Sequence, residues 1–171
     1  MTAPDWDQQM RSRLARGEES ALGELYDRLS PLVHGLAGQI LADEQAAAQL
    51  TREVFGHLWE HPEEFDPAER SLRSWVGELT HRGAVERLRR AALSPREIRE
   101  RVAAAQVQFV VAALPPALRE PLETTWFDRR TYQETARQLG ISEQAARHRL
   151  RLGLQLLASE LEYAPDRGAG G

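Results

Sequence analysis

Thr131–Leu157 reads TYQETARQLGISEQAARHRLRLGLQLL and is the stretch that decides the fold class. Thr131 and Glu134 have the spacing of a capping box, which predicts that a helix begins just after Thr131. Gly140 stands where a helix end favours a residue with positive φ, and Ser142 can cap a second helix. The sequence therefore predicts two short helices joined by a tight turn.

The charges in this stretch indicate a nucleic-acid partner. Residues 129–151 contain six arginines and two glutamates, a local charge of +4 in a chain whose net charge is −4. A helix, a short turn with glycine and an arginine-bearing helix form the helix-turn-helix motif, whose second helix enters the DNA major groove. The motif alone is not specific, because helix–glycine–helix pairs also occur in all-α domains that never touch DNA.

The composition limits what kind of protein this is. The chain has 171 residues, 42% of them apolar, so it can bury a core in one domain or in two small ones. It contains no cysteine, which excludes disulfides and thiolate chemistry. No apolar run approaches the roughly 18 residues of a membrane span, and the N-terminus lacks a signal-peptide core. We therefore expect a cytoplasmic protein without membrane insertion.

Charge is distributed unevenly along the chain. Residues 1–69 contain five arginines and fourteen acidic residues, a net charge of −9. Residues 82–101 contain seven arginines and three glutamates, a net charge of +4. An acidic N-terminal part followed by two basic stretches indicates separate surfaces for protein and for nucleic acid.

Apolar residues recur at spacings of three and four over most of the chain, which predicts an all-α fold without strands. Helices are expected over Ser20–Leu41, over Glu44–Trp59, from Leu72 into VERLRR and from Pro95 onward. Pro31 is expected to bend or divide the first of them.

Breaks in the pattern predict two small helical domains. The Leu93-Ser94-Pro95 step marks the end of the first domain, and Leu114-Pro115-Pro116 is a second break. We predict a domain at 1–92, a partly helical linker at 93–106, a second domain at 107–161 and a disordered tail at 162–171.

The expected helix LRSWVGELTHRGAVERLRR carries the second basic surface. Trp75, Leu79 and Leu88 can face inward, leaving a polar outer face. That outer face would collect His81, Arg82, Glu86, Arg89 and Arg90. Arginines hold phosphates and aromatic walls receive unstacked bases, which suits single-stranded or partly opened DNA. The alternative is a solvated basic helix with Trp75 as an ordinary core residue.

Together these segments resemble a bacterial extracytoplasmic-function sigma factor, the two-domain branch of the housekeeping-sigma superfamily. The resemblance covers roughly Ala21–Leu161 and is carried by TREVFGHLW, EEFDPAERSLRSWV, LTHRGAVERLRR and LPPALREPLE ahead of the helix-turn-helix. The third of these motifs is close to the form found in an actinobacterial subgroup partnered with anti-sigma proteins.

The resemblance implies a sigma region 2-like helical bundle and a region 4-like helix-turn-helix domain. Such a protein is an alternative sigma factor, which binds core RNA polymerase and directs promoter-specific initiation. The resemblance also implies three partners, namely core RNA polymerase, promoter DNA and an anti-sigma factor. It implies no catalysis, cofactor, metal or small-molecule substrate.

The resemblance also assigns roles to individual residues. The −10 element would be held by Trp75, His81, Arg82, Glu86, Arg89 and Arg90. The −35 element would be read by Glu143, Gln144, Arg147, His148 and Arg151. Core polymerase would be contacted through Gln49, Leu50, Arg52, Glu53 and Phe55.

One departure from the family pattern motivates a second hypothesis. The family's clamp-contacting helix carries a pattern like D-L-x-Q-E, whereas this chain reads Gln49-Leu50-Thr51-Arg52-Glu53. One acid and the glutamine are replaced, and an arginine is present. The alternative is therefore a degenerate sigma-like regulator that acts mainly through protein partners.

Two other classes of function are less well supported. An ordinary helix-turn-helix regulator with a ligand-sensing N-terminal domain would need a ligand pocket, which nothing in the sequence indicates. His57 and His61 have the spacing of a zinc pair on a helix, but Pro62 interrupts it and no third ligand is evident. We expect neither an enzyme nor a metal site.

Overall fold

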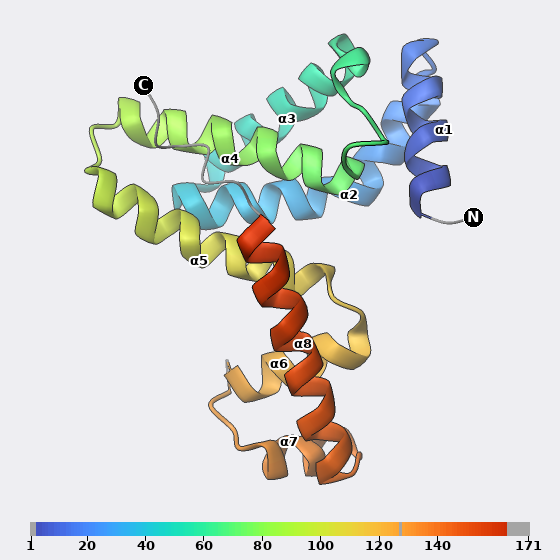
Figure 1. Cartoon of the computed structure of the whole chain (residues 1–171). Coiled ribbons are helices and arrows are strands. Elements are labelled where there is room, and N and C mark those ends of the chain that lie inside the picture. The colour runs from blue at the N-terminus through green and yellow to red at the C-terminus, as the bar shows by residue number, and fades with distance from the viewer. Residues whose placement is uncertain (1–2, 127, 164–171) are drawn as a thin grey trace. The chain divides into compact units, whose positions relative to one another are not determined.

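The computed structural model describes residues 3–126 and 128–163, with side chains for 5–126 and 128–159. These residues form eight α-helices and one short 3-10 helix, and no strand occurs among them (Figure 1). The all-α prediction is confirmed. Contacts divide the chain into two compact units, Met1–Ala105 and Gln106–Gly171.

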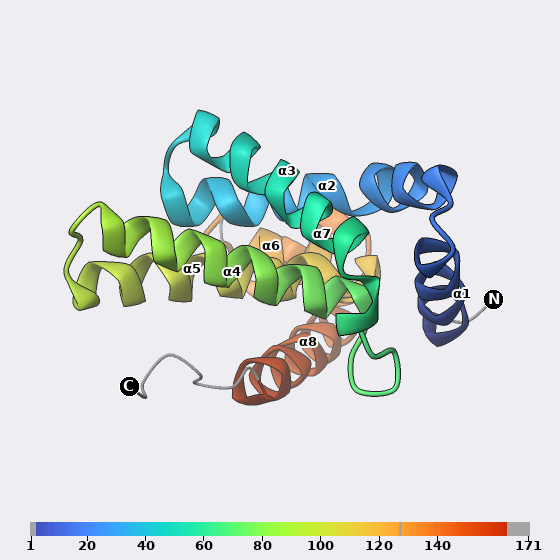
Figure 2. The ribbon, with the colours of Figure 1, turned by 90° about the horizontal axis from the view of Figure 1, so that it is seen from above.

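The N-terminal unit is a helical bundle with a short helix beside it. Its elements are α1 (Ala3–Ala15), α2 (Glu19–Leu41), α3 (Glu44–Glu60), η1 (Pro62–Glu64) and α4 (Leu72–Arg90). α2, α3 and α4 pack against one another, and α1 packs against α2 and η1 (Figures 1 and 2). The apolar faces predicted from the sequence meet in this core, which includes Leu25, Val33, Ile40, Leu58, Leu72 and Val76.

Pro31, which was expected to bend or divide α2, does not divide it, because the helix continues from Glu19 to Leu41. Pro31 has no N–H to donate to the carbonyl of Asp27, one turn earlier. Both residues lie on the exposed side of the helix, so water can bind that carbonyl instead. The helix therefore tolerates the proline on its outer face.

Polar side chains cap two of the three bundle helices, α3 and α4. Asp43 caps α3 by accepting the N–H of Ala46 at 2.9 Å, and Ser71 caps α4 by accepting the N–H of Ser74 at 3.1 Å. A second acceptor reaches α4 from far away in the sequence, because Asp7 Oδ2 of α1 accepts the N–H of Leu72 at 3.1 Å. Burial raises the pKa of Asp7 above its ordinary value.

α3 and α4 approach closely at Gly83. A Cβ atom at this position would lie 2.5 Å from Leu50 Cδ1, much closer than carbon atoms pack. Leu50 is 2% exposed and has little room to move away. Gly83 is therefore required by the contact between the two helices.

The segment after α4 differs from the linker expected at 93–106. α5 (Pro95–Ala113) is continuous, and its first half belongs to the N-terminal unit. Ile98 and Ala105 are buried, and Arg101 Nη1 donates to the carbonyl of Leu41 at 3.2 Å near the end of α2. The arginine satisfies a carbonyl that the helix end leaves without an intrahelical partner, so packing extends beyond the predicted boundary at residue 92.

The C-terminal unit contains the second half of α5, α6 (Pro116–Trp126), α7 (Tyr132–Leu139) and α8 (Glu143–Tyr163). Leu114, Leu118 and Leu122 form one buried cluster, and Val110, Val111 and Leu157 form another. Residues 162 and 163, which the sequence assigned to the tail, end α8, and the rest of the expected tail at 164–171 lies outside the described residues.

No helix in the described ranges 3–126 and 128–163 has the length and apolar character needed to cross a membrane.

Candidate nucleic-acid interface

The helix-turn-helix of α7 and α8 begins with the capping box predicted from the sequence. Thr131 Oγ1 accepts the N–H of Glu134 at 3.3 Å, and Glu134 Oε2 accepts the N–H of Thr131 at 2.8 Å. The hydrogen bonds from the backbone and the hydroxyl of Thr131 lower the pKa of Glu134. The predicted start of the first helix is confirmed.

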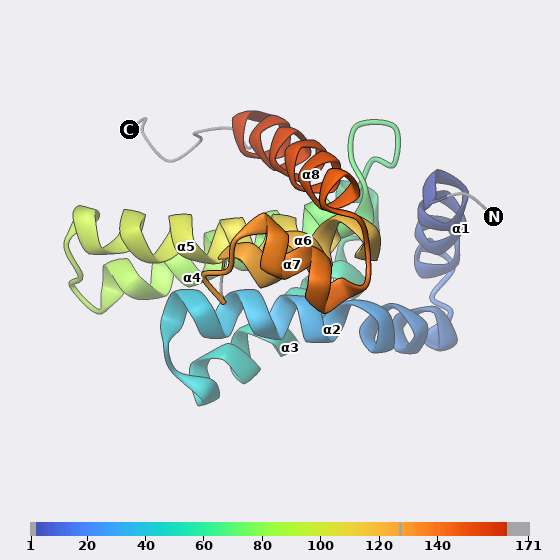
Figure 3. The ribbon, with the colours of Figure 1, turned by 90° about the horizontal axis from the view of Figure 1, so that it is seen from below.

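The turn between α7 and α8 also follows the sequence prediction. Gly140 adopts the left-handed conformation, with φ of 64°, and its N–H bonds the end of α7. Ser142 Oγ accepts the N–H of Ala145 at 3.1 Å and so caps α8. Figure 3 shows this short turn with the two helices close together.

Small buried residues set the contact between α7 and α8. Ala136 and Ala146 are 2% and 0% exposed, so their methyl groups lie in the core of the unit. Thr135 is also fully buried, and its hydroxyl hydrogen-bonds the hydroxyl of Thr125 on α6 at 2.9 Å. The helix pair is therefore fixed by residues other than its arginines, which remain available at the surface.

All five residues predicted to read the −35 element are exposed. They are Glu143, Gln144, Arg147, His148 and Arg151. Spacings of three and four place them on one side of α8, in its first two and a half turns. The N-terminal part of a second helix, held by a tight turn, is the part that enters the major groove in helix-turn-helix proteins.

Tyr132 contacts Arg147 and was not predicted from the sequence. Arg147 Nη2 donates to the Tyr132 hydroxyl at 2.7 Å, and the guanidinium carbon lies 4.6 Å from the centre of the Tyr132 ring. The two residues are fifteen positions apart on different helices. No local sequence signal marks such a pair, because it arises only from the way α7 and α8 cross.

α4 carries a second face of exposed charged residues. Arg82, Glu86, Arg89 and Arg90 are exposed at helical spacing, and Arg90 Nε donates to Glu86 Oε1 at 3.1 Å. His81 is half-buried, and burial lowers its pKa. The lowered pKa favours the neutral imidazole of His81 at pH 7 in the free chain.

Trp75 does not lie on this face. It is 4% exposed, and its ring stacks on Phe65 with 5.3 Å between centroids. Phe65 directly follows η1 and is 1% exposed. The structure therefore places Trp75 in the core of the unit, and its role at the −10 element stays a prediction.

The predicted polymerase contacts on α3 divide in a similar way. Gln49, Arg52 and Glu53 are exposed, whereas Leu50 and Phe55 are 2% and 4% exposed and pack in the core. The apolar members of that predicted set pack in the bundle, because their spacing is that of the buried side of α3, and their contact with polymerase stays a prediction.

Glu53 makes a contact that links α3 to α4. Its Oε2 accepts from Arg87 Nη2 at 2.6 Å, and Arg87 Nη1 donates to the carbonyl of Gly83 at 3.1 Å. The exposed acid at the centre of the predicted polymerase contact is thus already paired with an arginine of the candidate DNA helix.

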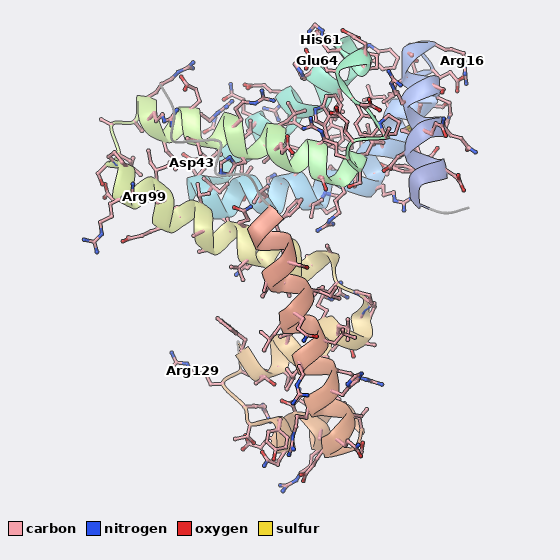
Figure 4. All side chains as sticks on the ribbon, in the orientation of Figure 1. Arg16, Asp43, His61, Glu64, Arg99 and Arg129 are labelled. Atoms are coloured by element: carbon pink, nitrogen blue, oxygen red, sulfur yellow. The ribbon has the colours of Figure 1, made fainter. Side chains whose placement is uncertain are left out.

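The histidines at the end of α3 are engaged with acidic side chains. His57 Nε2 hydrogen-bonds Glu64 Oε2 at 2.8 Å, and this bond lowers the pKa of Glu64. Figure 4 shows His61 and Glu64 at the same end of the unit. Among the residues that the structure describes, no group of three or more side chains could hold a metal ion.

Comparison with known proteins gives matches in both units. The model of sigma-70 region 2 matches residues 25–93, and that of sigma-70 region 4 matches residues 104–157. A solved complex of CnrH with the cytosolic domain of CnrY matches at 22% identity and a TM-score of 0.44, covering 94% of this chain and 99% of that chain.

Curated relatives match over nearly the whole length. The ECF RNA polymerase sigma factor SigK of Mycobacterium tuberculosis is 28% identical over an aligned length of 188 residues, in an alignment that covers 96% of this chain and all of the relative. SigK of Mycolicibacterium vanbaalenii is 27% identical over an aligned length of 171 residues, in an alignment that covers 89% of this chain and 87% of the relative.

Proposed function

Because this chain belongs to the extracytoplasmic-function branch of the sigma-70 family, we propose that its two units read two separate promoter elements. The chain is an alternative sigma factor, which directs transcription by core RNA polymerase at promoter DNA. Which residues perform each step is the proposal developed below.

The −35 element is read by the exposed face of α8. The observation that carries this proposal is that Glu143, Gln144, Arg147, His148 and Arg151 are all exposed on one side of a helix that a tight turn presents. Arginine forks match the major-groove edge of guanine, and glutamine matches adenine. Residues of these types on a presented helix are suited to reading bases rather than only holding phosphates.

The −10 element is held by the exposed face of α4. Arg82, Arg89 and Arg90 supply positive charge for the phosphates of a partly opened strand, and His81 supplies a neutral hydrogen-bonding group. Trp75 packs the start of α4 against Phe65 and so helps to hold the helix that carries this face. No nucleotide is hydrolysed in this scheme, because opening is driven by exchanging base stacking for protein contacts.

Core polymerase is contacted by the exposed side of α3. Gln49 and Arg52 stand at the surface, and Glu53 is exposed but bound to Arg87. Polymerase bound to this side of α3 would therefore contact Glu53, which forms an ion pair with Arg87 of α4. The chain would work in the cytoplasm, where the polymerase and the chromosome are. An anti-sigma factor is part of this proposal through the family pattern alone.

The test is transcription with purified core polymerase on a library of genomic fragments, with start sites mapped by sequencing of 5′ ends. We expect new start sites that appear only when the chain is added and that share two upstream elements. If the chain neither binds core nor changes any start site, the sigma-factor proposal is wrong, and a sigma-like regulator acting through protein partners becomes the better hypothesis.

The anti-sigma proposal has a test of its own. The full chain is recovered from its native cell under mild conditions, and the co-purifying proteins are identified. A small protein that co-purifies in place of core polymerase, and that stops transcription when added back in purified form, supports an anti-sigma partner. Recovery of core polymerase alone under all growth conditions contradicts it.

A further inference from the structure

Tyr132 and Arg147 form a contact that fixes one of the candidate base-reading side chains before DNA arrives. We propose that Tyr132 is a specificity-determining residue, which orients Arg147 for the edge of a single guanine in the −35 element. This inference rests on the proposed role of the α8 face and assigns a function to a residue outside that face.

The position of Tyr132 is itself well determined. It is the first residue of α7 and directly follows Thr131, whose capping box fixes the helix start. α7 is held in turn by the buried hydroxyl pair of Thr135 and Thr125. The tyrosine therefore projects from a rigid turn, rather than from a loop that could follow the arginine.

The contact restrains Arg147 in two ways at once. The ring lies under the guanidinium at 4.6 Å, a cation–π distance, and the hydroxyl accepts from Nη2 at 2.7 Å. A guanidinium has five N–H donors, and this hydrogen bond uses one of them. The rest of the fork remains able to make the two parallel hydrogen bonds that recognise guanine O6 and N7.

Restraint of this kind favours base reading over phosphate binding. The electrostatic attraction to phosphates is independent of sequence, and a mobile arginine can satisfy it from many rotamers. A bidentate contact with a base edge needs the plane of the guanidinium to be set, and the entropy lost on binding is smaller if it is set beforehand. Tyr132 supplies that setting without touching DNA.

The experiment measures base preference at each position of a promoter. Holoenzyme assembled from core polymerase and the full chain transcribes a template library in which both promoter elements are randomised, and the transcribed templates are sequenced. Four variants are compared with the wild type: Tyr132→Phe, Tyr132→Leu, Arg147→Ala and the double variant Tyr132→Leu/Arg147→Ala. Tyr132→Phe keeps the ring and removes only the hydroxyl.

We expect Arg147→Ala to reduce guanine preference at one upstream position by roughly tenfold, the effect of one lost bidentate contact. Tyr132→Leu should reduce preference at the same position by a similar factor, and Tyr132→Phe by about threefold, because the ring contact remains. In the Arg147→Ala background, Tyr132→Leu should change nothing further, because Tyr132 acts through Arg147.

Other outcomes overturn the inference in distinguishable ways. If Arg147→Ala removes the preference and both Tyr132 variants keep it, the −35 role stands and Tyr132 is not involved. If no variant changes any position, the proposed role of Arg147 fails as well. An equal loss at every position, together with a lower melting temperature of Tyr132→Phe, would show that Tyr132 only supports the fold. Increased transcription with unchanged preference would show that it shields Arg147.

Discussion

α4 and α8 are both candidate DNA helices, but they are held in place by different kinds of contact. The caps of α7 and α8 come from within three residues, at Thr131 and Ser142. α4 takes its second N-terminal acceptor from Asp7, 65 positions away, and its aromatic residue Trp75 is drawn into the core. Both helices bury an apolar side, but the start of α8 is capped only by neighbouring residues, whereas the start of α4 also depends on a residue far away in the sequence.

The largest expected effect tests whether Trp75 belongs to the core. Trp75→Ala should lower the free energy of unfolding of the N-terminal unit by about 3–5 kcal/mol, because it removes a large buried side chain. Chemical denaturation followed by circular dichroism measures the change, and Trp75→Phe, which keeps part of the stack on Phe65, should lose less. Unchanged stability together with loss of promoter opening would show that Trp75 contacts DNA rather than stabilising the core.

The next effect concerns the close contact between α4 and α3. Gly83→Ala should destabilise the bundle by about 1–3 kcal/mol, because its Cβ atom overlaps Leu50. Gly56→Ala is the matched control on α3, since a Cβ there meets nothing within 4 Å. It should instead stabilise the helix by roughly 0.5–1 kcal/mol. Similar changes in both variants would mean that α3 and α4 are not tightly packed.

The helix-turn-helix and Trp75 show what the sequence could and could not predict. Thr131, Glu134, Gly140 and Ser142 act on neighbours a few positions away, so their spacing was sufficient to predict the helix-turn-helix. Trp75 has the same local pattern whether it packs inward or meets a base. Only the fold of the loop that brings Phe65 against it decides between these two possibilities.

Contacts between distant residues were beyond the reach of sequence patterns for the same reason. Asp7 with Leu72, Glu53 with Arg87 and Tyr132 with Arg147 each join two helices. Periodicity shows which side of a helix is apolar, but not which residues of another helix lie opposite. The overall fold and the face of α8 were therefore predictable, whereas the internal partners of the site were not.

A smaller effect separates phosphate binding by α4 from base reading by α8. Arg89→Ala should leave stability nearly unchanged, because the side chain is exposed. In the holoenzyme it should weaken binding to a forked −10 probe and reduce the slope of log K against log salt by roughly 0.7–0.9, the effect of one lost phosphate contact. An unaltered slope in the Arg89→Ala holoenzyme would argue that this side of α4 does not meet DNA.

The smallest effect concerns the distant acceptor of α4. Burial raises the pKa of Asp7, so the folded chain holds its proton more strongly than the unfolded chain does. Stability should therefore rise as the pH falls through the folded pKa towards the ordinary value. Asp7→Asn keeps an acceptor oxygen without a charge and should remove this dependence, with a change at pH 7 within about 1 kcal/mol. Denaturation curves between pH 4 and pH 7 provide the measurement. The same pH profile in Asp7→Asn as in the wild type would contradict the prediction.

The division of labour between α4 and α8 can be tested by cutting DNA from each helix. The chain has no cysteine, so Glu86→Cys on α4 and Gln144→Cys on α8 each create a single attachment point for an iron chelate that cleaves nearby DNA. In holoenzyme bound to a promoter, we predict cleavage around the −10 element from position 86 and around the −35 element from position 144. Cleavage of one shared region by both probes, or none from position 144, would contradict the two-element promoter reading proposed for this chain.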